Sequence, residues 1–241
     1  MRKLHRVLPA ILAVFAPAAA SAQALQCRAP ERIVAPHPEG SSPREPRRVL
    51  PIGGYTLALI WAPEACHGRS ETIDSAFACG PSNRFGFTLH GLWPDGEGRE
   101  WPQYCAAAPL LPEALIRRHL CATPSAQLLQ HEYAKHGTCT GLPPAAYFAR
   151  STALYGRLHY PDMRALAGRR DLTARQFAAA FARANPGLTA DMVRLNVNRR
   201  GWLEEVWLCL DTRLSYRTCP VTQGGAPPTR RIRVQAPPSR H

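Results

Sequence analysis

The chain has 241 residues, enough for one domain with a substantial core, and no stretch after residue 22 is long and apolar enough to cross a membrane. Its formal net charge of +13 favours polyanionic partners such as nucleic acid, anionic lipid or cell-wall polymer. The eight cysteines include no CxxC pair, which argues against a zinc ribbon.

Residues 1–22 have the layout of a secretory signal peptide. The basic start carries three charges, at Arg2, Lys3 and Arg6, and an apolar run over 7–20 follows. Small residues then offer two cleavage sites, Ala20-Ser21-Ala22 and Ala22-Gln23-Ala24. We therefore expect a periplasmic or secreted protein with a mature charge of about +10, whose cysteines are paired as disulfides.

The first half of the mature chain is predicted to combine an irregular arm with two strands. Residues 23–54 are rich in Pro, Arg, Ser and Gly, which predicts an arm without regular structure, tied down at most by Cys27. Apolar runs predict buried strands at 55–61 and 85–90, separated by a loop over 62–83.

Helices are expected in the middle of the chain, at 112–120, 125–136, 144–158 and 173–184. Ser125 and Thr173 are the predicted N-cap residues of two of them. Strand character returns at 192–197 and 201–210. Alternation around Ile232 and Val234 predicts a short final strand before a basic tail at 236–241. Strands at both ends with helices between them predict a single α+β domain over 55–235.

A histidine closes the second predicted strand. His90 follows the apolar residues 85–89 and precedes Gly91-Leu92-Trp93-Pro94-Asp95, a run typical of a turn. Because core strands do not usually end on histidine, we expect the imidazole of His90 to face a cleft.

A second polar cluster lies at the end of the helix expected over 125–136. At about 100° per residue from His131, Lys135 falls at about 40°, Glu132 at about 100° and His136 at about 140°, so the four side chains share one arc. Lys135 is also the only lysine after the signal peptide. The histidines are five residues apart, unlike the i, i+4 pair of a helical zinc site, and Lys135 would repel a cation, so we expect no metal.

These side chains suit transfer of a phosphoryl group. Two histidines that titrate near neutral pH can pass protons to and from oxygen. A lysine and a third histidine suit a phosphate whose negative charge rises in the transition state. The set fits in-line attack by an internal hydroxyl, which RNA supplies as its 2′-OH and DNA lacks.

The segments Phe87–Asp95 and His131–Cys139 resemble the two active-site motifs of the ribonuclease T2 family. The patterns at 194–197 and 205–209 extend the resemblance over about residues 55–234. It implies an α+β fold in which a central antiparallel sheet is flanked by several helices and stabilised by disulfides. It also implies an endoribonuclease that cuts single-stranded RNA to a 2′,3′-cyclic phosphate and then hydrolyses this to a 3′-phosphate.

The same resemblance implies a role for each polar residue. His136 is then the general base and His90 the general acid of the first step, and the two exchange roles in the second. Glu132 and Lys135 stabilise the pentacovalent intermediate, and His131 holds the phosphate. Since a bare carboxylate would repel phosphate, we expect Glu132 to share a proton or to orient a histidine.

Base recognition is expected from three residues. Trp93 and Asp95 match positions that, in fungal members, stack on a base and bind its edge, and Trp101 stands where those members have a tyrosine. Stacking tolerates many bases, so low base specificity is expected; the alternative for Trp101 is that it simply covers core. Leu59 and Ile60 replace a glutamine of the plant members, which leaves the second base site unassigned.

The resemblance also implies two disulfides, Cys105–Cys139 and Cys209–Cys219. Four cysteines then remain to be paired, Cys27, Cys66, Cys79 and Cys121. Among these, a pair between Cys66 and Cys79 is favoured, and the alternatives stay open.

Two other functions compete with the ribonuclease. A catalytically silent basic protein of the same fold would bind polyanions with a steep salt dependence. A metal-dependent hydrolase would stop in EDTA. The complete set of polar residues argues against the first, and the helical spacing against the second. We expect a monomer that acts on RNA, uses no cofactor and has no membrane contact after processing.

Overall fold

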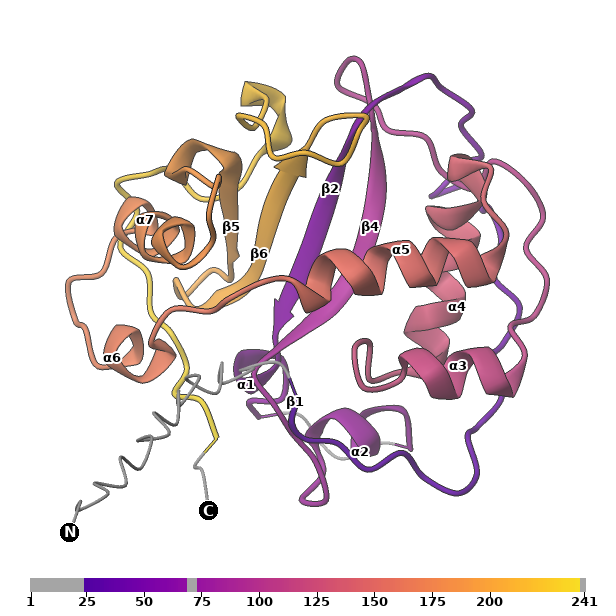
Figure 1. Cartoon of the computed structure of the whole chain (residues 1–241), viewed down its shortest axis with the longest axis horizontal. Helices are drawn as coiled ribbons and strands as arrows, with labels where there is room; N and C mark the ends of the chain where they lie inside the picture. Colours follow the sequence, from indigo (N-terminus) through magenta and orange to yellow (C-terminus); the bar gives the residue numbers. More distant parts are fainter. Residues whose placement is uncertain (1–23, 69–72, 239–241) are drawn as a thin grey trace, which may run out of the picture.

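The computed structural model describes residues 24–68 and 73–238 (Figure 1). The expected signal peptide at 1–22 and the last residues of the expected basic tail, 239–241, lie outside the described residues. No described helix is both long and apolar enough to cross a membrane.

A four-stranded antiparallel sheet with the order β4-β2-β6-β5 forms the centre of the molecule. Its strands are β2 (Ile52–Trp61), β4 (Phe87–Gly96), β5 (Val193–Val197) and β6 (Leu203–Leu210). Figure 1 shows α3, α4 and α5 on the β4 side and α6 and α7 near β5. The expected α+β fold with a flanked antiparallel sheet is confirmed.

The two faces of the sheet differ because side chains alternate along each strand. One face carries buried apolar residues such as Leu57 and Leu59 of β2 and Leu208 of β6, which belong to the core. On the other face, Glu205 and Trp207 of β6 are only partly buried. One side of the sheet therefore supplies the core, and the other carries polar groups.

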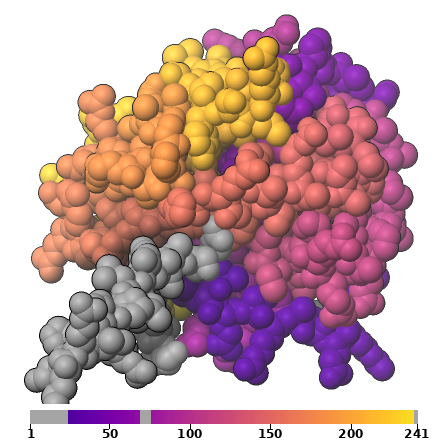
Figure 2. All heavy atoms as spheres, viewed as in Figure 1, coloured from indigo at the N-terminus to yellow at the C-terminus, as the bar shows by residue number. Residues whose placement is uncertain are grey.

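The four expected helices are present with ends shifted by at most two residues. They are α3 (Glu113–His119), α4 (Ala126–Lys135), α5 (Pro144–Gly156) and α7 (Ala174–Ala184). Both N-caps are confirmed: Ser125 accepts a hydrogen bond from the backbone N of Leu128, and Thr173 forms a capping box with Gln176. Figure 2 shows the segment around α5 as a continuous band across one face of the molecule.

The strand that contains His90 is longer than expected. β4 continues through the expected turn to Gly96, because β2 provides a pairing partner along its whole length. Ala58 pairs with Gly91 and Leu59 with Leu89, so His90 is the extra residue of a β-bulge. The prediction that the strand ends at His90 is wrong, since a local pattern does not show the partner that keeps residues 91–96 extended.

Other differences concern short elements. The strand expected over 85–90 is divided at Gly86, and its first residue belongs to β3 (Arg84–Phe85). The loop expected over 62–83 contains α1 (Ala62–Ala65) and α2 (Ile73–Cys79), and α6 (Met163–Ala167) was also not expected. Each is too short to show a period in the sequence. Three short 3₁₀ helices complete the described elements: η1 (Gly137–Thr140), η2 (Ala190–Met192) and η3 (Val221–Gln223).

The final strand expected around Ile232 and Val234 is replaced by isolated bridges. Arg231 bridges to Thr173, and Arg233 bridges to Trp202. Ile232 and Val234 are nevertheless buried in the core, which explains their apolar alternation without a strand.

The N-terminal arm is held along much of its length, and the expectation that at most Cys27 ties it down is wrong. β1 (Ala24–Gln26) pairs with β3, and the backbones of Arg48 and Gln103 exchange two hydrogen bonds of 2.9 Å. Contacts of this kind join residues far apart in the chain, so the composition of the arm did not reveal them.

All eight cysteines form disulfides: Cys27–Cys121, Cys66–Cys79, Cys105–Cys139 and Cys209–Cys219. The two pairs implied by the resemblance and the favoured pair are confirmed, and the fourth joins the two cysteines left over. Cys27–Cys121 anchors the start of the arm beside the end of α3.

Candidate active site

The site residues named from the sequence all line one pocket of about 480 Å³ on the polar face of the sheet. They are His90, Trp93, Asp95, Trp101, His131, Glu132, Lys135 and His136. β4 supplies three of them, and α4 with its C-cap residue supplies four. The two segments singled out in the sequence are therefore brought together by the packing of α4 beside β4.

His90 lies between two carboxylates. Its Nδ1 is 2.6 Å from Oε1 of Glu205 on β6, and its Nε2 is 3.5 Å from Oε1 of Glu132 on α4. Burial lowers the pKa of His90, but the hydrogen bond to Glu205 and the charges of both carboxylates outweigh it, so this pKa is raised overall. The bulge at His90 helps to direct the ring, because a bulge re-aims the side chain of its extra residue.

His136 is the C-cap residue of α4 and is buried. Its ring stacks on that of Trp93, with ring centroids 5.3 Å apart and an interplanar angle of 27°. Burial, followed by the positive charges of Lys135, His131 and His90, holds the pKa of His136 well below its usual value. The pKa values of His90 and His136 are therefore shifted in opposite directions.

Glu132 is buried beside His90. Its Oε2 accepts a hydrogen bond of 2.7 Å from the indole Nε1 of Trp93, while Oε1 has no hydrogen-bond partner. Burial raises the pKa of Glu132 although three cationic side chains lie nearby. A Cβ at Gly91 would lie 1.8 Å from Oε2 of Glu132, so only glycine leaves room for this carboxylate.

Lys135 and His131 meet carboxylates of the N-terminal arm. Nζ of Lys135 is 2.5 Å from Oε1 of Glu45, and Nδ1 of His131 is 3.5 Å from Oε2 of Glu39. The phenol of Tyr104 donates to the other oxygen of Glu45 at 3.1 Å. The arm thus places two acidic groups on the cationic side of the pocket.

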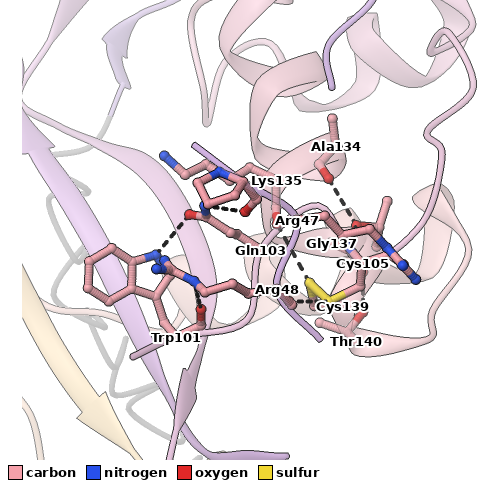
Figure 3. Close-up of a disulfide and its surroundings, with 12 residues drawn as sticks. Arg47, Arg48, Trp101, Gln103, Cys105, Ala134, Lys135, Gly137, Cys139 and Thr140 are labelled. Atoms are coloured by element: carbon pink, nitrogen blue, oxygen red, sulfur yellow. Dashed lines mark hydrogen bonds between the residues drawn. A yellow bond between two sulfur atoms is a disulfide. The ribbon is translucent and has the colours of Figure 1, made fainter. Parts of the chain in front are cut away.

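Of the residues expected to bind a base, Trp93 packs against the rings of His90 and His136, whereas Asp95 and Trp101 have other partners. Asp95 accepts a hydrogen bond of 2.9 Å from the hydroxyl of Thr56, and burial raises its pKa. Trp101 is 47% exposed, so its ring is not covering core. The guanidinium of Arg48 lies 4.9 Å from the centroid of that ring, and Gln103 accepts from its Nε1 at 3.2 Å (Figure 3).

The Cys105–Cys139 disulfide joins the segment after Trp101 to the end of α4, as Figure 3 shows. Two hydrogen bonds accompany it: the backbone N of Tyr104 donates to the carbonyl of Lys135 at 2.8 Å, and the backbone N of Cys105 donates to Oγ1 of Thr138 at 3.1 Å. The position of Trp101 relative to Lys135 is therefore set by covalent and hydrogen-bonded links.

Several residues of the site were not singled out from the sequence. Glu205 contacts His90 from 115 positions away, and Glu45 contacts Lys135 from 90 positions away. The available signal for Glu205 was its position in a mostly apolar strand, two residues before Trp207 and therefore on the same face. For Glu45, in an irregular arm, we find no comparable signal.

Comparison with solved structures defines the class of the fold. Trichomaglin, described as a novel S-like ribonuclease, superposes with a TM-score of 0.60 at 22% identity, over 74% of this chain and 96% of that one. The model of the ribonuclease T2 family matches residues 52–219. This chain belongs to the ribonuclease T2 family.

Two bacterial relatives are also similar in sequence. A protein of Haemophilus influenzae named "Probable ribonuclease" is 28% identical over 180 residues, which are 70% of this chain and 61% of that relative. A "Ribonuclease" of Aeromonas hydrophila is 32% identical over 162 residues, 65% of this chain and 71% of its own. The chain thus spans less than two thirds of the Haemophilus protein.

Proposed function

We propose that the protein is a secreted endoribonuclease that cleaves single-stranded RNA with low base specificity. The reaction is transphosphorylation to a 2′,3′-cyclic phosphate, followed by hydrolysis to a 3′-phosphate. It runs on a pair of histidines, without a metal or cofactor, and the protein acts as a monomer. Membership of the ribonuclease T2 family and the geometry of the pocket support this proposal.

The observation that carries the proposal is that His90 and His136 line one pocket and have pKa values shifted in opposite directions. His136 has a lowered pKa and is neutral near pH 7, as a general base must be. His90 has a raised pKa and keeps its proton to higher pH, as a general acid must. Environments that separate the pKa values of two titrating groups assign the base and the acid.

In the first step His136 takes the proton of the 2′-OH. The 2′ oxygen bonds to phosphorus, the bond from phosphorus to the 5′ oxygen breaks, and His90 gives its proton to that oxygen. In the second step water replaces the 2′ oxygen on phosphorus, with His90 as base and His136 as acid. Each step returns both histidines to the state that the next one requires.

Lys135 and His131 are the groups proposed to hold the phosphate. Both line the pocket on the side of His136, and both carry donors that an anion can share with the arm carboxylates. Glu132, whose raised pKa favours its protonated form, adds a donor to the intermediate without adding charge. A protonated carboxyl group would not repel the phosphate, as a carboxylate would.

Low base specificity follows from the type of base contact proposed. Trp101 presents an exposed aromatic ring, and Trp93 and Asp95 line the same pocket. Stacking on an aromatic ring is worth about 1–3 kcal/mol per base and discriminates weakly between bases.

A periplasmic or extracellular location is proposed from two features. The four disulfides require an oxidising compartment to form and persist. The layout of residues 1–22 is that of a secretory signal peptide.

The test is cleavage of single-stranded RNA by the purified, oxidised protein in EDTA, with products separated so that cyclic phosphates are identified. His90→Ala and His136→Ala are compared with His159→Ala, whose side chain is exposed outside the pocket. We expect cyclic products from the wild type and His159→Ala, and a loss of at least about 10³-fold in the other two.

Two results would contradict the proposal. Intact RNA across pH 4 to 8, together with tight, salt-sensitive binding of RNA, DNA and heparin, would indicate a silent polyanion-binding protein. Cleavage that stops in EDTA and returns with a divalent cation would indicate a metal-dependent hydrolase.

A further inference from the structure

The carboxylate of Glu205 is held from three sides on the polar face of the sheet. Oε1 is 2.6 Å from Nδ1 of His90. Oε2 accepts two hydrogen bonds, one of 3.1 Å from Nδ2 of Asn196 on β5 and one of 2.8 Å from the indole Nε1 of Trp207. The two donors fix the carboxylate through Oε2, and this leaves Oε1 directed at the imidazole of His90.

The strand register brings Glu205 to His90. β2 lies between β4 and β6, and Ala58 of β2 pairs with Gly91 on one side and with Trp207 on the other. Glu205 pairs with Ile60, the next residue of β2 on the same face as Ala58, and the imidazole and the carboxylate meet across β2.

The pKa values of the two carboxylates next to His90 are shifted in opposite directions. Burial raises the pKa of Glu205, but its hydrogen bonds and the charge of His90 outweigh burial, so this pKa is lowered overall. Burial dominates at Glu132, and its pKa is raised. Glu205 is therefore the more acidic of the two carboxyl groups, and it lies closer to the ring than Glu132 does, at 2.6 Å against 3.5 Å.

We propose that Glu205 is a positioning residue that holds His90 with a proton on Nδ1 and with Nε2 directed into the pocket. A carboxylate that accepts Nδ1–H selects the tautomer whose Nε2 is the proton-transferring atom, and it fixes the ring plane. The inference rests on the proposed function, in which Nε2 gives its proton to the 5′ oxygen and later takes one from water.

The charge of Glu205 has a second effect, on the pH range of the enzyme. The charged or titratable groups around His90 are Glu205 from β6 and Glu132, Lys135 and His136 from α4 and its C-cap. The charge of Lys135 disfavours the imidazolium, whereas the hydrogen bond to Glu205 and its charge favour it, as does any charge on Glu132. Glu205 thus keeps His90 protonated to higher pH and extends the basic limb of the rate profile.

Glu205→Gln tests both effects at once. Asn196 and Trp207 both donate to Oε2, so the amide oxygen of the glutamine takes that position and its NH₂ group faces Nδ1 of His90. Nδ1 must then accept, which places the proton of the neutral ring on Nε2. The variant thereby loses the charge and reverses the tautomer.

We expect Glu205→Gln to move the basic limb of the kcat profile down by about 1–2 pH units, with KM changed little. Hydrolysis of the cyclic phosphate should slow by about 10²-fold or more, since the reversed tautomer has no lone pair on Nε2, and cyclic product should accumulate. Glu205→Asp, which keeps the charge, should recover part of both effects. Glu204→Gln, on the exposed neighbouring position of β6, should behave like the wild type.

A readout independent of activity is the ¹⁵N spectrum of histidine-labelled protein titrated with acid. In the wild type, neutral His90 should carry its proton on Nδ1, and in Glu205→Gln its pKa should fall and its proton should move to Nε2. Wild-type His90 with its proton on Nε2 would overturn the proposal, even if no Glu205 variant folds. So would a Glu205→Gln variant that folds and leaves both the basic limb and the His90 titration unchanged.

The outcomes separate this inference from the proposed function. A wild type that makes no cyclic product defeats the proposed function, while the ¹⁵N titration still decides whether Glu205 holds His90. A wild type that makes cyclic product with a His90 that does not respond to Glu205 defeats only the inference.

Discussion

Oε1 of Glu45 lies 2.5 Å from Nζ of Lys135, so an acidic residue of the N-terminal arm is paired with a cation of the pocket. The hydrogen bond to Lys135 also lowers the pKa of Glu45. Glu39 of the same arm lies 3.5 Å from His131. These carboxylates neutralise charge where an RNA phosphate is proposed to bind, and an incoming phosphate must compete with them.

Glu45→Gln should therefore strengthen phosphate binding. The pair is partly exposed, and such pairs are worth about 0.2–1 kcal/mol, so the inhibition constant of inorganic phosphate should fall by about two- to fivefold at low salt. The gain should shrink as salt is raised. The matched control is Asp171→Asn, which removes the same charge from a pair with Arg169 outside the pocket. Equal inhibition constants for Glu45→Gln and the wild type would show that the pair does not compete with phosphate.

Gly91→Ala should damage the pocket while leaving the fold in place. The new Cβ would lie 1.8 Å from Oε2 of Glu132 and 2.7 Å from Nε1 of Trp93, so the buried carboxylate must move and its hydrogen bond must break. We expect kcat/KM to fall by about 10²-fold and the free energy of unfolding by about 1–3 kcal/mol.

Steady-state kinetics and denaturant unfolding measure the two effects. Gly156→Ala is the control, since a Cβ there meets no atom within 4 Å. If Gly91→Ala kept wild-type kcat/KM, the close approach of Glu132 to the strand would not matter for activity.

The stability of the protein should depend on the protonation of His136. Its folded-state pKa lies below the unfolded value of 6.5, so its contribution is complete above pH 6.5 and is lost as the pH falls through the folded value. The raised pKa of His90 acts in the opposite sense. The stability that His90 contributes is complete below pH 6.5 and is lost as the pH rises through its folded-state pKa.

Urea unfolding between pH 4.5 and 8.5, with the disulfides intact, tests this. His136→Gln should reduce the slope of stability against pH below 6.5, where one proton accounts for at most about 1.4 kcal/mol per pH unit. His90→Gln should instead reduce the loss of stability that the wild type shows as the pH rises above 6.5. An unchanged acid slope in His136→Gln would mean that its imidazole titrates normally in the folded protein.

Removing the Cys105–Cys139 disulfide should affect both stability and activity. With the two cysteines 34 positions apart in the sequence, the double alanine variant should lose about 3–4 kcal/mol of stability. Because the bond holds the segment of Trp101 against the end of α4, kcat/KM should also fall by roughly tenfold. Replacing both Cys66 and Cys79, away from the pocket, should cost stability alone. Equal kinetic effects of the two double variants would argue against a role of the first disulfide in placing Trp101.

Much of the site could be predicted because its residues are close in sequence. His131, Glu132, Lys135 and His136 share an arc through helical periodicity alone, and all four line the pocket as that periodicity predicts. The helices themselves were predictable from apolar spacing and from local caps such as Ser125. Contacts within one helix depend only on the spacing of residues along the chain, which can be read from the sequence.

The tertiary structure decided the contacts that shift the pKa values and set the orientations of these residues. Glu205 reaches His90 through the β4-β2-β6 register, Glu45 reaches Lys135 through the path of the arm, and His90 projects from a bulge that exists only because β2 pairs with β4. The sequence by itself determined which groups carry the proposed chemistry. Only the fold decided in which direction the pKa of each carboxyl group and each histidine is shifted, because burial and the distance between charges arise from packing between segments far apart in the chain.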